Sequence, residues 1–314
     1  MRLGLFDGPR GRFLGAVLGG LPGGPPGGEV VDLAALVSGP PAGGLASVLA
    51  LDASALARLA QRVTTAHRER REIHPLDTLV PAPPFAGTKI LCQVVNYVAH
   101  SDEIAIAAPR NPFLFYKPAS ALSGATQDVL AHACSGKLDY ECELAVVIGR
   151  PGRNIPAEHA FDHVGGYTVM NDWSYRDLQF NERAPHLNHS FGRNWTKGKG
   201  LDTACALGPW IVTADEVDDP YALALSTVVN GRVRQKAMTG DMLLTIPELI
   251  AEASLGTTLH PGDVIATGTP GGVCLGGDEF LTAGDEVVCE ITGIGRISQR
   301  VVADDGAYVR GGTP

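Results

Sequence analysis

The sequence predicts an α+β fold that is rich in β-structure, with a small N-terminal α+β domain (residues 1–75) and a larger β-rich domain (residues 76–314). Two observations support this fold class. From Lys89 onward, short runs of β-branched and apolar residues alternate with Gly, Pro, Asn and Asp, which is typical of short strands joined by turns. The 39 glycines and 22 prolines also indicate many tight turns, at a level below that of a disordered chain.

The N-terminal domain is predicted from a few short elements. A strand-like start covers residues 3–6, and a second apolar run covers residues 30–33. Asp52 is a suitable N-cap, and apolar residues recur behind it at helical spacing, so residues 51–54 are expected to open a helix that runs to about residue 71. The segment 73–84, IHPLDTLVPAPP, contains four prolines and is predicted to be a linker.

The larger domain shows mainly strand patterns. These runs read ILCQVVNY, LDYECELAVVIG, GYTVMND, GPWIVT, LSTVVNG, DVIATG and DEVVCEITGIG. Their spacing favours a compact sandwich or barrel-like arrangement. One helix is expected over residues 246–254, with Pro247 in its first turn.

Charge and composition exclude several classes of partner. The formal net charge of −9 argues against nucleic acid, which requires clustered Lys and Arg. No apolar run is long enough to span a membrane, and the first residues lack the pattern of a secretory signal. The six cysteines form no C-x-x-C pair, which is typical of reduced thiols. We therefore expect a cytoplasmic protein that acts on small molecules.

The passage DYECEL, residues 139–144, is the strongest chemical signal in the sequence. Side chains alternate along a strand, so Glu141 and Glu143 project from the same face. Two adjacent carboxylates on an apolar strand repel each other unless a cation compensates. Asp172, at the end of the predicted strand 165–171, is the expected third carboxylate. Spacing alone leaves a second interpretation open, in which both glutamates form a solvated strand face.

The ligand type favours a hard cation. Three carboxylates without Cys or His suit Mg²⁺, or Mn²⁺ or Ca²⁺, better than zinc, and they leave positions free for a chelating substrate. His186 and His189, within the polar segment 180–194, form an alternative H-x-x-H metal site. The nearby carboxylates make the better site for a hard ion.

Five segments in order give the sequence a family resemblance. They are residues 96–103 (NYVAHSDE), 139–149 (DYECELAVVIG), 171–179 (NDWSYRDLQ), 198–202 (GKGLD) and 261–270 (PGDVIATGTP). In these segments the chain resembles the fumarylacetoacetate hydrolase family, in its acylpyruvate hydrolase or fumarylpyruvate hydrolase-like branch. The resemblance implies a mixed β-roll catalytic domain behind the small N-terminal domain, a homodimer and a bound Mg²⁺ or similar ion.

The resemblance also implies roles for individual residues. Its metal ligands correspond to Glu141, Glu143 and Asp172, the same three carboxylates. Its catalytic residues correspond to His100, Glu103 and Lys199. Its substrate-binding positions correspond to Arg176, Gln179 and Thr269. Two departures from the family pattern are the bulky residues 173–175 and the long polar segment 180–194.

The implied reaction is hydrolysis of a carbon–carbon bond in a β-diketo acid through a metal-bound enolate. His100, oriented by Glu103, would activate water, and Lys199 would stabilise charge on oxygen. The first alternative is decarboxylation, isomerisation or hydration of a related 2-keto acid in aromatic catabolism, since the same enolate serves those reactions. The second alternative is a catalytically idle β-rich binding protein.

Overall fold

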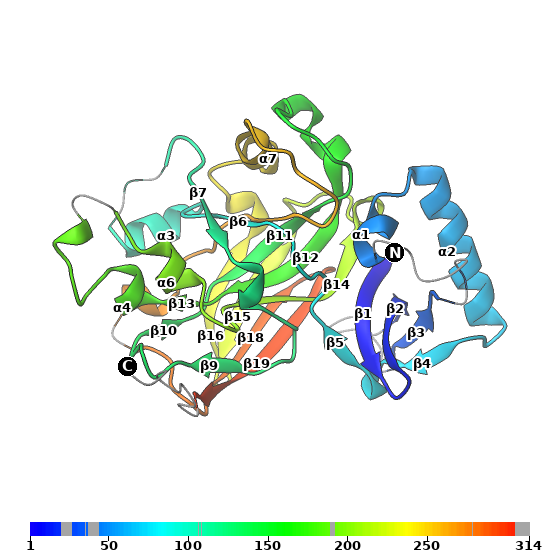
Figure 1. The fold of residues 1–314 in the computed structure, drawn as a ribbon, viewed down its shortest axis with the longest axis horizontal. Helices are drawn as coiled ribbons and strands as arrows, with labels where there is room; N and C mark the ends of the chain where they lie inside the picture. Colours follow the sequence, from blue (N-terminus) through cyan, green and yellow to red (C-terminus); the bar gives the residue numbers. More distant parts are fainter. Residues whose placement is uncertain are drawn as a thin grey trace, which may run out of the picture.

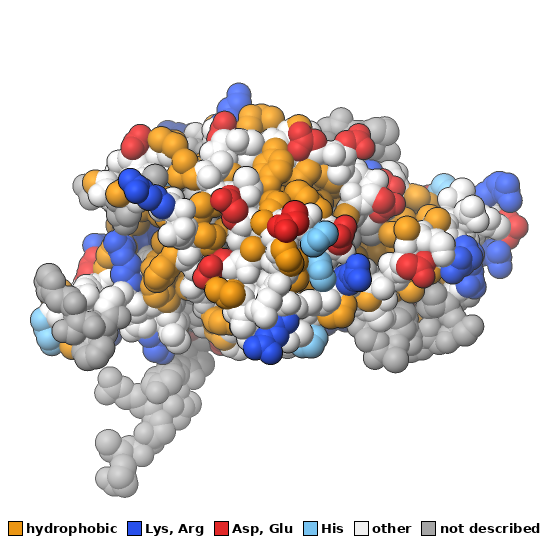
Figure 2. All heavy atoms as spheres, turned by 90° about the horizontal axis from the view of Figure 1, so that it is seen from above, with side chains coloured by type: hydrophobic (Ala, Val, Ile, Leu, Met, Phe, Trp, Pro, Cys, Tyr) orange, Lys and Arg blue, Asp and Glu red, His pale blue; other side chains and the backbone are white. Residues whose placement is uncertain are grey.

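The structure is a computed structural model, and it describes residues 1–19, 27–34, 36, 44–105, 107, 109–188, 192–277 and 279–304. Within these ranges no helix combines the length and the apolar character needed to cross a bilayer. Figure 1 shows the N-terminal strands and α2, in blue and cyan, at one end of the molecule beside the larger body of strands. Figure 2 shows one face of the described molecule, on which basic and acidic side chains are interspersed.

The N-terminal elements form an antiparallel set of strands with two helices. They are β1 (Arg2–Gly8), β2 (Gly11–Leu18), β3 (Glu29–Asp32), α1 (Gly44–Leu49), α2 (Ala53–Arg68) and β4 (Ile73–Pro75). The expected helix is present, and the Asp52 side chain accepts the N–H of Ala55 as its N-cap. It ends earlier than predicted, at Arg68, and Arg70 has a φ of 55°, which a continuing helix does not allow.

The predicted linker 73–84 is more ordered than expected. It contains β4, the 3₁₀ turn η1 (Leu76–Thr78) and β5 (Val80–Ala82). β4 pairs with β3 and β5 pairs with β1. Both are short edge strands, where proline is tolerated because one side of the strand donates no ladder hydrogen bond.

One twelve-stranded sheet runs through the molecule. Its order is β4-β3-β2-β1-β14-β12-β11-β17-β6-β7, with β5 beside β1 and β8 beside β14. The strands beyond the N-terminal set are β6 (Ile90–Gln93), β7 (Leu114–Lys117), β8 (Leu122–Ser123), β11 (Cys142–Ile148), β12 (Val164–Asp172), β14 (Cys205–Thr213) and β17 (Val264–Ala266). Since β1 pairs with β14, the N-terminal strands extend the same sheet. The division into two domains after residue 75 therefore remains a prediction.

A second sheet packs on the first. Its order is β16-β15-β18-β19-β9, and its strands are β9 (Val129–Ala131), β15 (Ala224–Val229), β16 (Arg232–Met238), β18 (Glu286–Ile291) and β19 (Gly295–Ala303). β18 and β19 contact β12, and β19 also contacts β14. Every residue of β11 and of β14 is buried, so these strands read as continuous apolar runs with few charges. The buried core of the two sheets therefore includes β11, β12 and β14.

The remaining elements are short. A two-stranded sheet joins β10 (Leu138–Asp139) to β13 (Ser174–Tyr175). The helices are α3 (Val98–Glu103), α4 (Arg176–Gln179), α6 (Trp195–Lys199) and α7 (Ile246–Ser254), and the 3₁₀ turns are η2 (Ala119–Ala121), η3 (Ala157–His163), η4 (Ala214–Glu216), η5 (Thr239–Asp241) and η6 (Cys274–Gly276). The predicted helix 246–254 is confirmed, with Thr245 and Glu248 forming its capping box.

Candidate active site

Three carboxylates meet where β11 begins and β12 ends. Glu141 directly precedes β11, Glu143 lies within it, and Asp172 ends β12. The N–H of Asp172 donates to the carbonyl of Glu141 at 2.8 Å, which places these two residues side by side across the strands. One oxygen of each of the three carboxylates lies within 4.8 Å of the others. Their exposed fractions are 5%, 1% and 1%, so the face is buried rather than solvated.

Two buried lysines neutralise part of this charge. The ammonium of Lys199 donates to Glu141 at 2.5 Å and to Asp172 at 2.8 Å. Lys117 binds the other oxygen of Asp172, and it donates to the carbonyl of Trp173 at 3.2 Å. Sequence reasoning missed Lys117. A signal was present, because Lys117 follows Phe115 by two residues on β7 and therefore shares its buried phase.

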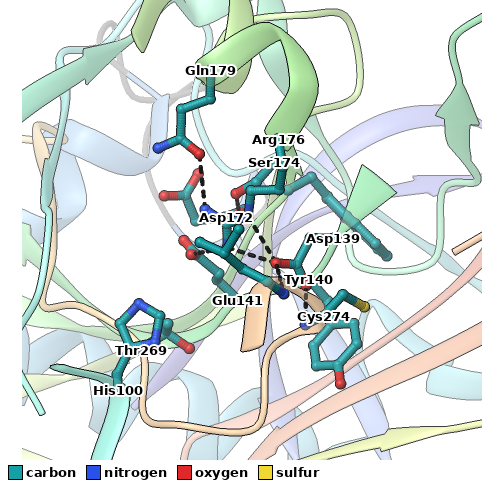
Figure 3. A network of polar contacts seen from close by, with 12 residues as sticks. His100, Asp139, Tyr140, Glu141, Asp172, Ser174, Arg176, Gln179, Thr269 and Cys274 are labelled. Atoms are coloured by element: carbon teal, nitrogen blue, oxygen red, sulfur yellow. Dashed lines mark hydrogen bonds and ion pairs between the residues drawn. The ribbon is translucent and has the colours of Figure 1, made fainter. Parts of the chain in front are cut away.

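Arg176, at the start of α4, links the cluster to a fourth carboxylate (Figure 3). Its Nε donates to Asp139 at 2.8 Å, and its Nη2 contacts Asp139 at 2.7 Å and Glu141 at 2.5 Å. Its Nη1 donates to the side-chain carbonyl of Gln179 at 3.0 Å. Asp139 also accepts the backbone N–H groups of residues 274 and 275, at 2.7 and 3.2 Å. Asp139 therefore fixes the position of Arg176.

The electrostatic balance favours an additional cation. Among the described residues, four buried carboxylates face three buried cations, Lys117, Lys199 and Arg176. Burial and repulsion by the other two carboxylates of the trio raise the pKa of Glu143 well above its usual range. Burial opposes ionisation of Glu141 too, but Arg176 and Lys199 outweigh it and lower the pKa of that carboxyl. These donors fit a hard divalent ion, which would relieve the repulsion at Glu143.

His100 and Glu103 lie together on α3. His100 is 2% exposed, and its Nδ1 lies 3.4 Å from Glu103 Oε2. Glu103 accepts the N–H of Gly272 with its two oxygens, at 3.1 and 3.2 Å. A Cβ on Gly276 would lie 2.3 Å from the Glu103 side chain, so a larger residue there would displace that side chain. The loop 272–276 thus holds the glutamate that contacts the histidine.

The packing of α6 on α4 fixes Lys199 and Arg176 relative to each other. A Cβ on Gly198 would lie 2.3 Å from the Cβ of Gln179. This close approach is possible only with glycine at that position. Asn194 accepts the N–H of Lys197 as N-cap of α6. The two short helices thereby present their cations to the same carboxylates.

A cavity joins most of the predicted site residues. His100, Glu141, Arg176, Gln179 and Lys199 line it, together with Arg193. Its remaining wall consists of apolar residues, namely Val94, Val95, Ile104, Phe115, Trp195 and Leu275. It encloses about 40 Å³, far below the roughly 300–1,000 Å³ of typical ligand pockets.

Thr269 is buried, and His186 lies at the surface. The hydroxyl of Thr269 donates to the carbonyl of Cys142 at 2.9 Å and accepts from Gln235 at 2.9 Å. Its expected contact with substrate remains a prediction. His186 is exposed, and His189 lies outside the described residues.

A second group of possible ligands lies on the N-terminal strands. Asp32, Glu72 and His74 bring donor atoms within 4.8 Å of one another, but all three are at least partly exposed. Arg10 already lies 3.2 Å from Glu72 and 3.4 Å from His74. An exposed group of this kind, already paired with a guanidinium, is a weaker cation site than the buried trio.

The role of Asp139 leads to a stability prediction. Asp139→Ala is expected to lower the free energy of unfolding by about 3–5 kcal/mol, because it removes one of the two carboxylates that bind the buried Arg176 and leaves two buried backbone N–H groups without their acceptor. Asp7→Ala is the matched control, since Asp7 forms an equally direct two-point ion pair with Arg12 on the exposed surface. The control should cost about 0–1 kcal/mol. Urea denaturation of both variants measures the difference, and equal losses would contradict the structural role of Asp139.

Comparison with known proteins agrees with this architecture. Residues 89–302 match the family described as fumarylacetoacetate (FAA) hydrolase, C-terminal. The chain is similar to human oxaloacetate tautomerase FAHD2A, mitochondrial, with 42% identity over 223 residues, or 70% of this chain and 68% of that protein.

Solved structures extend the similarity over nearly the whole chain. One is maleylpyruvate hydrolase from Sphingobium sp. SYK-6 in complex with manganese(II) ion and pyruvate, at 35% identity and a TM-score of 0.76, covering 96% of this chain and 99% of that one. Another is 5-carboxymethyl-2-hydroxymuconate delta-isomerase from Mycobacterium smegmatis, at 32% identity and a TM-score of 0.72, covering 97% and 99%. The predicted β-rich α+β fold is confirmed. These relatives share one enzyme family but not one reaction.

Proposed function

The chain belongs to the fumarylacetoacetate hydrolase family, and we propose that it is a divalent-metal-dependent hydrolase that cleaves a carbon–carbon bond in a β-diketo acid of the acylpyruvate or fumarylpyruvate type. The observation that carries this proposal is the buried His100, which contacts Glu103 and lines the same cavity as Glu141 and Lys199. Hydrolysis requires a base that activates water, and His100 beside the carboxylate cluster meets this requirement.

We propose Glu141, Glu143 and Asp172 as the ligands of the metal ion, Mg²⁺ or a similar cation. Such an ion would polarise the keto acid electrophilically. Support comes from the donor set, its burial and the raised pKa of Glu143. The similar Sphingobium maleylpyruvate hydrolase was solved in complex with manganese(II) ion and pyruvate, which supports a site for a divalent ion and a keto acid.

The side chains then have distinct roles. His100, oriented by Glu103, takes a proton from water, and the hydroxide adds to the distal carbonyl. Cleavage of the bond to the central methylene gives a carboxylic acid and pyruvate, and the methylene carbon takes up a proton. The ammonium of Lys199 stabilises negative charge on oxygen during these steps. Arg176 and Gln179 line the cavity and contribute donors for the polar end of the substrate.

A substrate panel tests the proposed reaction. The purified protein is incubated with Mg²⁺ or Mn²⁺ and acetylpyruvate, fumarylpyruvate or oxaloacetate. Loss of the enol absorbance is followed together with pyruvate formation. Hydrolysis is expected to yield one pyruvate for each diketo acid consumed. Absence of pyruvate from every diketo acid would contradict the proposal.

Tautomerisation of oxaloacetate is the second candidate, and a specific observation favours it. The chain is 42% identical to a human oxaloacetate tautomerase over 70% of its length. In the panel, this activity would convert enol to keto oxaloacetate without pyruvate or CO₂. Oxaloacetate decarboxylation would instead release both, so the three reactions are separable.

Metal binding is expected to release a proton. Glu143 has a raised pKa, so without a cation it retains its proton to a higher pH than an ordinary glutamate. A divalent ion competes with that proton, and its affinity should therefore rise with pH. Calorimetric titration with Mn²⁺ in two buffers of different ionisation enthalpy should reveal about one proton released per ion. Glu143→Gln should weaken binding and remove this release, whereas identical heats in both buffers would contradict the assignment.

Lys199→Met separates metal binding from charge stabilisation. The substitution removes a donor from the cavity, and turnover should fall about 10²- to 10³-fold. It also frees one oxygen of Glu141 and one of Asp172, so metal affinity should stay the same or rise. Steady-state kinetics and metal titration test both effects. An unchanged turnover rate would remove Lys199 from the mechanism.

A further inference from the structure

Arg193 differs from the other cations that line the cavity. Arg176 and Lys199 each bind two buried carboxylates. Arg193 lines the same cavity, but in the described part of the chain it pairs with no carboxylate. It belongs to the polar segment 180–194, which separates α4 from α6.

The surrounding structure holds Arg193 in place. Its guanidinium lies over the ring of Phe180, with 4.0 Å between Cζ and the ring centroid. Its carbonyl accepts the N–H of Trp195 at 3.0 Å, and the next residue, Asn194, donates its N–H to the carbonyl of Gln179 at 2.9 Å. Stacking on an aromatic ring leaves the in-plane N–H groups of a guanidinium free to bind an anion.

The position of Arg193 carries an electrostatic cost. Burial and repulsion by Arg176 both lower the pKa of Arg193, so its charge is disfavoured in this environment. The apolar wall residues of the cavity offer no compensation, and Glu141, the carboxylate that lines it, already binds Arg176 and Lys199. A bound anion would remove this cost.

The three cations that line the cavity differ in how exposed they are, and this difference distinguishes its inner end from its outer end. Arg176 and Lys199 are 3% and 2% exposed, whereas Arg193 is only half-buried. Arg193 therefore marks the outer end. A ligand whose keto-acid group lies at the carboxylate trio extends from there toward Arg193.

We propose that Arg193 is a specificity-determining residue that binds a second carboxylate at the distal end of the substrate, so that the site selects keto diacids over keto monoacids. This inference rests on the proposed function, because it places the keto-acid group at the carboxylate trio. It adds a residue and a substrate class that the shared reaction chemistry does not specify.

A binding experiment tests the proposal without turnover. The Mn²⁺-loaded protein is titrated calorimetrically with 2-oxoglutarate and with 2-oxovalerate, which have five carbons each and differ at the distal carboxylate. Neither is a β-diketo acid that the proposed reaction would cleave. The variants are Arg193→Gln and the matched control Arg183→Gln. Arg183 lies on the same segment, is exposed and donates to the carbonyl of Cys134 at 2.8 Å, so its loss changes the net charge equally.

The wild-type protein should prefer the diacid by about tenfold or more, as expected for a charge-assisted hydrogen bond. Arg193→Gln should bring the two affinities within about threefold of each other, mainly by weakening diacid binding, and Arg193→Lys should restore part of the preference. Arg183→Gln should retain the wild-type preference. Equal affinities in the wild type, no binding of either acid, or an unchanged preference in Arg193→Gln would each overturn the proposal.

A kinetic experiment separates this inference from the proposed function. If the wild type hydrolyses acetylpyruvate and fumarylpyruvate, Arg193→Gln should lower kcat/KM for the diacid fumarylpyruvate about tenfold or more. It should change kcat/KM for the monoacid acetylpyruvate less than about threefold. A diacid preference in binding without any hydrolysis would reject the proposed reaction and retain the role of Arg193. Hydrolysis with equal losses for both substrates would reject the role of Arg193 and retain the reaction.

Discussion

Asp172→Asn is expected to abolish metal-dependent turnover, with a loss of about a thousandfold or more. The substitution keeps the size of the side chain and removes the charge that ends β12 beside Glu141. A bound divalent ion contributes several kcal/mol of stabilisation to a developing negative charge, which corresponds to this factor. The variant also loses the partner of two buried ammonium groups, Lys117 and Lys199. Mn²⁺ binding, measured by titration, and turnover should therefore be lost together.

Asp263→Asn is the control for the loss of a buried acid. Asp263 is 3% exposed and pairs with Lys89, and the backbone N–H of His260 donates to it at 2.6 Å, but it does not belong to the carboxylate trio. This variant should lower the free energy of unfolding and keep metal affinity and turnover. Thermal unfolding of both variants shows whether the assayed protein is folded. Full activity of folded Asp172→Asn would reject the metal assignment.

His100→Ala is expected to lower the rate of the chemical step by about 10²- to 10⁴-fold, the usual contribution of a general base. His100 lines the cavity and contacts Glu103, but it is not one of the three carboxylates. Metal affinity should therefore change little. Single-turnover kinetics with saturating Mn²⁺ measure the step, and metal titration measures the affinity.

Glu103→Gln and His163→Ala provide the comparison. Glu103→Gln should have a smaller effect than the loss of His100, because the imidazole remains and only its orientation is altered. His163 is half-exposed, and its Nδ1 contacts the carbonyl of Arg150 at 2.9 Å in a region outside the cavity. Its replacement should leave turnover unchanged. If metal affinity falls in parallel with the rate in His100→Ala, then His100 is not the base.

Patterns that depend on neighbouring residues can be read correctly from the sequence. Alternation places Glu141 and Glu143 on one face, and the structure puts both in the carboxylate trio. Capping and helical spacing predict α2 and α7, and α7 has the expected bounds. These features follow from dihedral angles and side-chain direction within a few residues, so a short stretch of sequence determines them.

The sequence predicts poorly those features that depend on pairing between distant segments. The prolines in residues 73–84 predict a linker, whereas β4 and β5 pair there as edge strands. Sequence reasoning assigned no role to Lys117 or Asp139, although each follows the same alternation as a neighbouring buried residue. Their partners lie 55 and 37 residues away in the sequence, at Asp172 and Arg176. Strand register brings them together, and one sequence does not specify that register.

The sequence by itself determined the fold class, the face shared by Glu141 and Glu143, and the family to which the chain belongs. Only the tertiary structure decided which cations meet those carboxylates, that the loop 272–276 holds Glu103, and that Arg193 lines the cavity without a carboxylate partner among the described residues. The reason is physical. Side-chain direction along a strand is a local property, whereas the pairing of buried charges depends on how separate strands and helices pack against one another.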